Sequence, residues 1–495
     1  MHRLVSRAAR TAVAVALLST VTGRAHAGGL FWSDRGVRPM GRGGAFVAGA
    51  DDLGAVWYNN AGIASAGSSF LFDATMMIYG ADFTRRTQVI DSGGTVRTYQ
   101  YPTVTGTPTP LPLPTIAGSL TIGDKKEWTL AAAIVTPYAP LTTWPETVNG
   151  TPAPQRYSTI SLDGTALLDV GLYAAWKPSE HLSIGAGLHF LVGNFQSTVY
   201  LNANPNDRLL GAPEDPQYDT LAQIRAGVFS PTGSLGLIYE PIKELRFGVS
   251  GQLPYWINAP ASVKLRLPTA APFDNASVQD DSARVKFRLP AIVRAGVEVR
   301  PIPELRVEAA YVYESWGLHD TIDIISKGSL VNVTGFPSPF RIAPISLQRN
   351  FQDTHSVRLG GEYTVDLGGE TKLDLRLGGA METSAIPEAY VTALTIDGLK
   401  FYASVGAGLH VGPRWRFDVM YTHMIIPDIQ VSPAEAGITA INPVRGYPAP
   451  AVAINGGTYS VHTDLIGLGL SYSFDPGPQD PPKPPPGKPK PAHTK

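Results

Sequence analysis

VKFRLPAIVRAGVEV, residues 285–299, carries apolar side chains at all its odd positions, from Val285 to Val299. The even positions between them include Lys286, Arg288, Arg294, Gly296 and Glu298. Successive side chains of a β-strand point to opposite faces, so a period of two residues indicates a strand with two unlike faces. The stretch predicts one strand in which a single face is apolar from end to end and the other is charged or small.

The same period recurs at residues 305–313 and 373–381, where Leu, Val, Ala and Tyr alternate with charged or small residues. A soluble β-sandwich and an outer-membrane barrel both satisfy this pattern, and alternation alone does not separate them. No window between Gly28 and Phe474 predicts a transmembrane helix. A membrane protein with this sequence would therefore have to be a barrel.

The spacing of the turns favours the barrel. Short links at residues 123–127, 177–181, 240–244, 300–304, 366–370 and 412–413 alternate with seven long polar or Pro/Gly-rich stretches. The long stretches lie near residues 87–113, 139–158, 200–219, 263–281, 317–351, 384–397 and 428–456. This asymmetry is typical of the periplasmic turns and extracellular loops of bacterial outer-membrane barrels. We therefore predict an all-β fold, a 14-stranded antiparallel transmembrane β-barrel, with both chain ends on the short-turn side.

The predicted strands are near residues 68–86, 114–123, 127–138, 159–176, 182–199, 220–239, 245–262, 282–300, 304–316, 352–366, 371–383, 398–411, 414–427 and 457–474. Aromatic residues Tyr173, Trp176, Tyr239 and Trp415 stand beside short turns, as expected of an interfacial girdle in contact with outer-membrane lipid. The last strand closes at Phe474, which predicts recognition by the barrel-assembly machinery. We expect a monomer.

The two ends of the chain differ from its middle. Residues 1–27 combine four Arg, the apolar run Thr11–Val21 and the Ala25-His26-Ala27 site, which predicts a cleaved secretory signal peptide. Residues 475–495 are rich in Pro and Lys and predict a disordered tail. Export to the bacterial outer membrane agrees with the absence of Cys, because the fold does not rely on disulfides.

The charge balance argues against nucleic acid as a partner. Of 40 Lys+Arg and 41 Asp+Glu, the part between the two ends holds 32 basic and 39 acidic residues. Nucleic-acid binding requires a basic face. The predicted lumenal charges are close to balanced and should pair across strands and around the chain before the first strand: Arg294, Glu298, Arg306, Glu308, Arg358, Glu362, Arg376, Arg416 and Asp418.

Residues 28–66 precede the first strand and do not alternate. They contain Gly41-Arg42-Gly43-Gly44-Ala45, Ala50-Asp51-Asp52 and Tyr58-Asn59-Asn60-Ala61-Gly62. These pieces resemble the N-terminal hatch of the outer-membrane long-chain fatty acid and aromatic hydrocarbon transport family (FadL/TodX type). Residues 128–138, 357–363 and 373–379 are similar to the same family, so the resemblance covers nearly all of residues 28–474. The departure is Asn60, where the family usually has Pro, and it puts the gating geometry in question.

The resemblance implies a barrel of residues 67–474 plugged by the hatch, residues 28–66. It implies a passive transporter of hydrophobic molecules, with fatty acids favoured, which captures the solute in extracellular loops and passes it to an internal pocket. The solute then leaves laterally through a gap in the barrel wall, at a kink in the third strand. Asn59, Asn60 and Ala61 would face that gap, and Pro137 is a candidate for the kink, although an ordinary strand end explains Pro137 equally well.

Two further groups of residues are candidate binding residues. Phe31 and Trp32 at the mature start suit a segment that reaches into a pocket, and anchoring of the hatch explains them too. Leu209, Leu210 and Phe273 in long loops are candidates for the capture groove, and packing within the loops is an equal alternative.

The sequence shows no motif for catalysis. It lacks G-x-S-x-G, H-E-x-x-H, a P-loop and paired His at metal spacing, and no Ser/His arrangement of a lipase or protease is recognisable. We therefore expect no enzymatic activity, no cofactor and no metal. Two alternatives stay open: a general diffusion porin for polar solutes, which would conduct ions, and a barrel adhesin or hydrolase, whose activity would survive deletion of residues 28–62.

Overall fold

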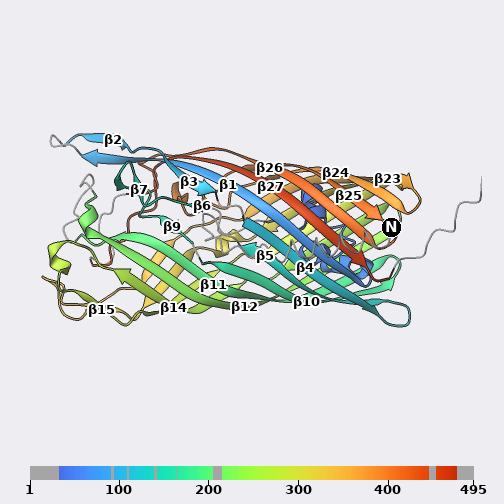
Figure 1. The fold of residues 1–495 in the computed structure, drawn as a ribbon, viewed down its shortest axis with the longest axis horizontal. Coiled ribbons are helices and arrows are strands. Elements are labelled where there is room, and N and C mark those ends of the chain that lie inside the picture. Colours follow the sequence, from blue (N-terminus) through green and yellow to red (C-terminus); the bar gives the residue numbers. More distant parts are fainter. Residues whose placement is uncertain are drawn as a thin grey trace, which may run out of the picture.

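A computed structural model of the chain describes residues 33–90, 94–108, 111–138, 142–162, 164–204, 214–444 and 453–475. Fourteen antiparallel wall strands form a long, closed barrel (Figure 1), which confirms the predicted fold class. In order, the wall consists of β1 (Ser69–Ile90), β4 (Leu111–Ile122), β5 (Trp128–Tyr138), β9 (Thr159–Ser161) with β10 (Ala166–Ser179), β11 (Leu182–Asn202), β12 (Asp219–Ile242), β13 (Leu245–Gln252) with β14 (Trp256–Arg266), β16 (Ser282–Arg288) with β17 (Ile292–Ile302), β18 (Leu305–Glu314) with β19 (Thr321–Ser326), β22 (Ile345–Gln348) with β23 (Thr354–Gly368), β24 (Thr371–Glu382), β25 (Lys400–Val411), β26 (Trp415–Val431) and β27 (Gly457–Ser473).

The first and last strands close the barrel. β1 pairs with β27 from Ser69 opposite Ser473 to Arg85 opposite Gly457. Beyond the last strand, the Phe474 N–H donates to the Ser68 carbonyl at 2.9 Å. Neither the first nor the last strand is therefore a free sheet edge, which is the condition for a β-protein in lipid.

The long connections are more ordered than the sequence predicts. They hold β2 (Val96–Gln100), β3 (Val104–Pro108), β6 (Thr142–Thr143), β7 (Thr147–Val148), β8 (Thr151–Pro152), β15 (Ser277–Gln279), β20 (Ser329–Val331) and β21 (Phe340–Arg341). They also hold the 3₁₀ turns η2 (Pro216–Tyr218), η3 (Ala271–Phe273), η4 (Trp316–Leu318) and η5 (Glu388–Tyr390). β1, for example, runs past the predicted end at residue 86 to pair with β2, because main-chain pairing does not require an alternating sequence.

The stretch 285–299 is not one strand with one apolar face, so that prediction was wrong. Val285 in β16 points inward and is 0% exposed, whereas Val293 in β17 points outward and is 47% exposed. The strand is interrupted around Pro290, between β16 and β17. Odd-numbered residues point inward before this interruption, and even-numbered residues point inward after it. The same change separates β13 from β14.

The change of parity has a physical reason. β17 carries its apolar residues on the outside and Arg294 and Glu298 inside, as a wall in lipid must. β16 exposes Lys286 and Arg288 and buries Phe287, as a wall with water outside must. In these strands, the half of the barrel next to the long loops, the upper barrel, has apolar side chains inside, and the half next to the short turns, the lower barrel, has charged ones.

Aromatic side chains surround the short-turn end of the barrel. Trp176, Tyr239 and Trp415 are exposed there, and Trp128 stacks on Trp176 with 5.6 Å between ring centroids. Tyr173, which we predicted for this girdle, instead points into the lumen and is buried, because it lies an odd number of residues from Trp176.

The hatch lies inside the barrel, next to the short-turn end (Figure 1). It contains α2 (Val37–Gly41), α3 (Ala55–Tyr58) and η1 (Asn60–Ser65), and nearly all of residues 33–63 are buried. Each helix is too short to be stable alone, so packing in the lumen holds it. No helix within the described parts of the chain is long and apolar enough to cross a membrane.

Candidate functional site

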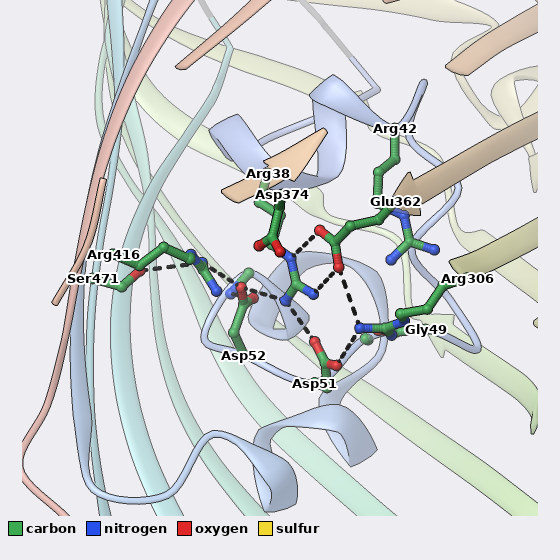
Figure 2. A network of polar contacts seen from close by, with 12 residues as sticks. Arg38, Arg42, Gly49, Asp51, Asp52, Arg306, Glu362, Asp374, Arg416 and Ser471 are labelled. Atoms are coloured by element: carbon green, nitrogen blue, oxygen red, sulfur yellow. Dashed lines mark hydrogen bonds and ion pairs between the residues drawn. The ribbon is translucent and has the colours of Figure 1, made fainter. Parts of the chain in front are cut away.

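The hatch is held in the lumen by a network of alternating charges (Figure 2). Arg38 of α2 pairs with Asp51 at 2.6 Å, with Asp52 at 3.0 Å and with Glu362 of β23 at 2.7 Å. From the wall, Arg306 reaches Asp51 at 2.6 Å and Arg416 reaches Asp52 at 2.7 Å. Eight of the nine predicted lumenal charges form ion pairs across strands or with the hatch, as predicted, whereas Arg294 lies over the rings of Trp57 and Tyr58. The Ala50-Asp51-Asp52 piece of the hatch is the centre of the network.

A second anchor is a single carboxylate from the wall. Glu308 of β18 is fully buried and accepts the backbone N–H groups of Val47, Ala48 and Gly49 at 2.6, 2.9 and 2.8 Å. Arg42 Nη2 lies 3.5 Å from the same carboxylate and 3.1 Å from Glu298. Hydrogen bonds to an ionised acceptor are stronger than neutral ones, so Glu308 fixes this loop of the hatch.

The pKa values of the hatch carboxylates Asp51 and Asp52 predict how the anchoring of the hatch depends on pH. Burial acts to raise the pKa of Asp51, but Arg306 and Arg38 outweigh it and hold that pKa below its usual range. Arg416 and Arg38 likewise outweigh burial and lower the pKa of Asp52. The stabilisation from such groups is complete above the unfolded-state pKa of about 3.9 and is lost as the pH falls through the lower native value.

We therefore expect the anchoring that Asp51 and Asp52 supply to persist at about pH 5 and to be lost only well below about pH 4. Conductance of the reconstituted barrel in planar bilayers, measured during acidification, checks this. An increase in conductance between pH 7 and pH 5 would show that groups other than Asp51 and Asp52 hold the hatch in the lumen.

The Asn59-Asn60-Ala61 motif lies against β11 and β12. Asn59 Nδ2 donates to the carbonyls of Val47 at 2.9 Å and Leu237 at 3.1 Å, and Asn60 Nδ2 donates to Ser234 Oγ at 2.5 Å. Ala61 is fully buried. A Cβ at Gly185 would lie 2.3 Å from the Asn60 carbonyl carbon, so this glycine on β11 permits the close approach.

Ser234 belongs to a polar chain that the sequence did not reveal. His189 Nε2 lies 2.5 Å from Ser234 Oγ, and His189 Nδ1 lies 3.1 Å from Asp169 Oδ2. The three residues come from β12, β11 and β10, 65 positions apart at the extremes, so no local motif marks them. In this arrangement the Ser234 hydroxyl is engaged by the Asn60 amide, and the chain of hydrogen bonds ties η1 to the wall.

The wall pairing is interrupted between β4 and β5. Their register ends at Thr115 opposite Val135, although β4 continues along β1 as far as Leu111. Pro114 accepts a hydrogen bond from Thr136 Oγ1 at 3.3 Å, so its carbonyl faces β5. Since the N–H and C=O of a strand residue face the same neighbour, the missing donor of Pro114 also faces β5.

The pairing of β5 with its other neighbour, β10, is irregular as well. The register of β5 with β10 shifts between Val135 and Tyr138, which places Pro137 within a bulge. Arg35 of the hatch donates Nε to the Thr136 carbonyl at 2.9 Å and Nη2 to the Pro137 carbonyl. The hatch residue at the interruption is thus Arg35, whereas Asn59 and Asn60 contact β12.

Two cavities lie in the upper barrel, beyond the hatch. The inner cavity has apolar walls that include Trp316, Phe351 and Ile386, and Ser33 of the hatch lines it together with Glu382. The outer cavity is lined mainly by aliphatic side chains: Val199, Leu201, Ala222, Ile224, Val263, Leu265, Ile324, Ile342, Ile345, Leu347, Leu394, Ile438, Ile441 and Ile454. Mostly apolar linings with a few polar groups are typical of small-molecule sites.

Of the other predicted site residues, four lie outside the described part of the chain and one is buried among the loops. Phe31, Trp32, Leu209 and Leu210 lie outside the described residues. Phe273 is buried in a separate loop cluster with Ala203, Ala270, Leu330, Val333, Ile342 and Val444. Arg35 was not among the predicted site residues, and Pro137, whose carbonyl accepts from Arg35 Nη2, is the sequence signal that marked its partner strand β5.

Comparisons with known proteins agree with this architecture. Residues 18–474 match the family described as "Outer membrane protein transport protein (OMPP1/FadL/TodX)". A candidate outer membrane protein of Neisseria meningitidis serogroup B is 26% identical over 164 residues, and the match spans 32% of this chain and 32% of that relative.

Solved structures share the fold. A Pseudomonas aeruginosa FadL homologue superposes with a TM-score of 0.66 at 15% identity, over 90% of this chain and 100% of that one. The Pseudomonas putida toluene transporter TodX gives 0.59 at 14% identity, over 89% and 99%. The Ralstonia pickettii toluene transporter TbuX gives 0.56 at 15% identity, over 90% and 99%. With its plugged barrel and a family match over residues 18–474, this chain belongs to the OMPP1/FadL/TodX family of outer-membrane transport proteins.

Proposed function

We propose that this protein carries hydrophobic molecules, long-chain fatty acids first among them, inward across the outer membrane without a bound energy source. The solute enters between the extracellular loops, occupies the outer and then the inner cavity, and leaves sideways between β4 and β5. The observation that carries the proposal is an outer cavity with mainly aliphatic walls, above a hatch that is filled with ion pairs. Such a lumen suits an apolar solute and opposes free flow of ions.

The interruption between β4 and β5 supports lateral release. An apolar solute that crossed the lower lumen would have to pass the charged hatch, at a high desolvation cost to the charges. In this proposal the solute leaves through the interruption toward lipid and does not cross that network. Movement of Arg35 away from Thr136 and Pro137 would be part of the opening, and Asn59, Asn60 and Ala61 would determine how η1 moves with it.

Transport of aromatic hydrocarbons is the second candidate, because two of the structural relatives are named toluene transporters. The aliphatic lining of the outer cavity favours a long alkyl chain.

In the same proposal, residues 1–27 are cleaved on export and residues 475–495 form a tail. The barrel is a monomer that is assembled through its last strand and held in lipid by its aromatic girdle.

Uptake by cells that lack their own transporter of this type tests the function. We expect labelled oleate to enter faster with this protein than in empty cells, and the Asn59→Ala, Asn60→Ala double variant to reduce that rate, because both amides seat η1. Asn258→Ala, on the exposed face of β14, is the matched control. Faster entry of toluene alone would favour the aromatic class.

If neither solute enters faster despite confirmed assembly in the outer membrane, the proposed transport fails. Ion conductance would then test the porin alternative. Lipid cleavage or surface binding that persists after deletion of residues 28–62 would indicate a hydrolase or adhesin.

A further inference from the structure

Arg349 lies where the two cavities meet. Among the described residues, it is the one that lines both the inner and the outer cavity. It follows β22 directly and is 6% exposed, and its backbone N–H donates to the Asp320 carbonyl at 2.8 Å. A solute that moves from the outer to the inner cavity must pass this side chain.

The guanidinium of Arg349 is buried without a counter-charge. Its Nε has no hydrogen-bond partner, and no described carboxylate lies within ion-pair distance of it. Other buried arginines of the lumen are compensated: Arg306 and Arg376 pair with wall carboxylates, and Arg294 lies over the rings of Trp57 and Tyr58. An uncompensated buried charge is costly, so this position is suited to an anion supplied by a ligand.

The surrounding charges favour an anion at Arg349 over one deeper in the barrel. In the outer cavity, Arg349 is the one charged residue among the described lining. In the inner cavity, Glu314, Glu382 and Asp397 are acidic, and Lys400 is already paired with Glu382 at 3.0 Å and Asp397 at 2.5 Å. A carboxylate would be repelled from that side.

We propose that Arg349 binds the carboxylate of a long-chain monocarboxylic acid whose alkyl chain lies in the outer cavity, and that it selects such acids over neutral hydrocarbons. The inference rests on the proposed transport function and assigns its specificity to one residue. The planar guanidinium can bind both oxygens of a carboxylate at once, and the aliphatic walls around Ile324, Ile345 and Leu347 bury the chain.

Binding of two ligands with the same chain and different heads tests the assignment. Radiolabelled oleate and radiolabelled oleyl alcohol are titrated onto the full-length protein in lipid nanodiscs. We expect Arg349→Met to weaken oleate binding by about tenfold or more and to change the affinity for oleyl alcohol by less than about twofold. Arg349→Lys should retain part of the preference for oleate, because it keeps the charge and loses the bidentate geometry. Arg341→Met, at an exposed arginine of the same connection, is the control and should behave as wild type.

The outcomes separate this inference from the proposed function. Unchanged oleate binding in Arg349→Met, or an equal loss of both ligands, would overturn the assignment of specificity. Hatch-dependent oleate uptake that survives Arg349→Met would leave transport standing and remove this inference alone. Failure of the wild type to bind or import either ligand would remove the proposed function, and this inference with it.

Discussion

Replacing Glu308 with alanine should unseat the hatch and convert the plugged barrel into a pore that conducts ions. The carboxylate accepts three backbone N–H groups of the hatch, from Val47, Ala48 and Gly49, and it lies beside Arg42. Hydrogen bonds to charged groups contribute about 1.5–3 kcal/mol each, and loss of the acceptor leaves buried donors unsatisfied. We therefore expect the hatch to lose at least about 3 kcal/mol of anchoring.

Single-channel recording in planar bilayers measures the effect directly. Wild type should remain closed, and Glu308→Gln should be intermediate, because one amide oxygen replaces two carboxylate oxygens. Glu304→Ala removes an exposed carboxylate from the turn just before β18 and is the matched control. A folded Glu308→Ala barrel that stays closed would show that the Asp51 and Asp52 network alone holds the hatch.

Closing the interruption between β4 and β5 with a disulfide should abolish uptake. Pro114 and Thr136 follow the last register pair, Thr115 and Val135, and the Thr136 hydroxyl lies 3.3 Å from the Pro114 carbonyl oxygen. The chain has no Cys of its own, so a Pro114→Cys, Thr136→Cys pair would form one defined bond in the oxidising periplasm. Uptake of oleate should fall by about tenfold or more when the pair is oxidised and return on reduction.

The control is a second cysteine pair lower in the same two strands. Thr121 and Thr129 are partners in the register, with their hydroxyl oxygens 3.3 Å apart. A Thr121→Cys, Thr129→Cys disulfide joins strands that are already paired, so it should leave uptake unchanged. Normal uptake through the oxidised Pro114→Cys, Thr136→Cys protein would exclude this interruption as the exit.

Much of the fold can be predicted from local sequence because strand alternation and turn chemistry are local properties. Short links such as residues 366–370 and 412–413 mark tight turns, and the strands on either side follow with errors of a few residues. The hatch is different, because α2, α3 and η1 have no strong propensity of their own. Its recognition came from resemblance, and its helices form because the lumen buries them.

Which face of each strand points into the barrel could be determined only from the tertiary structure. Val285 and Val293 share a parity in one alternating run, yet the first packs inside the barrel and the second faces outward. Alternation states only that two faces differ, and whether water or lipid lies outside decides which of them turns inward. The position of a residue along the barrel axis is a property of the closed fold.

The candidate site shows the same division. From the sequence alone follow an exported 14-stranded barrel, a preceding hatch and a balanced set of lumenal charges. The tertiary structure decided that Arg35 meets β5, that Asp169, His189 and Ser234 align behind Asn60, and that Arg349 lies unpaired between two cavities. Each of these arrangements joins strands or loops distant in sequence, and such contacts depend on register and closure, which no local pattern contains.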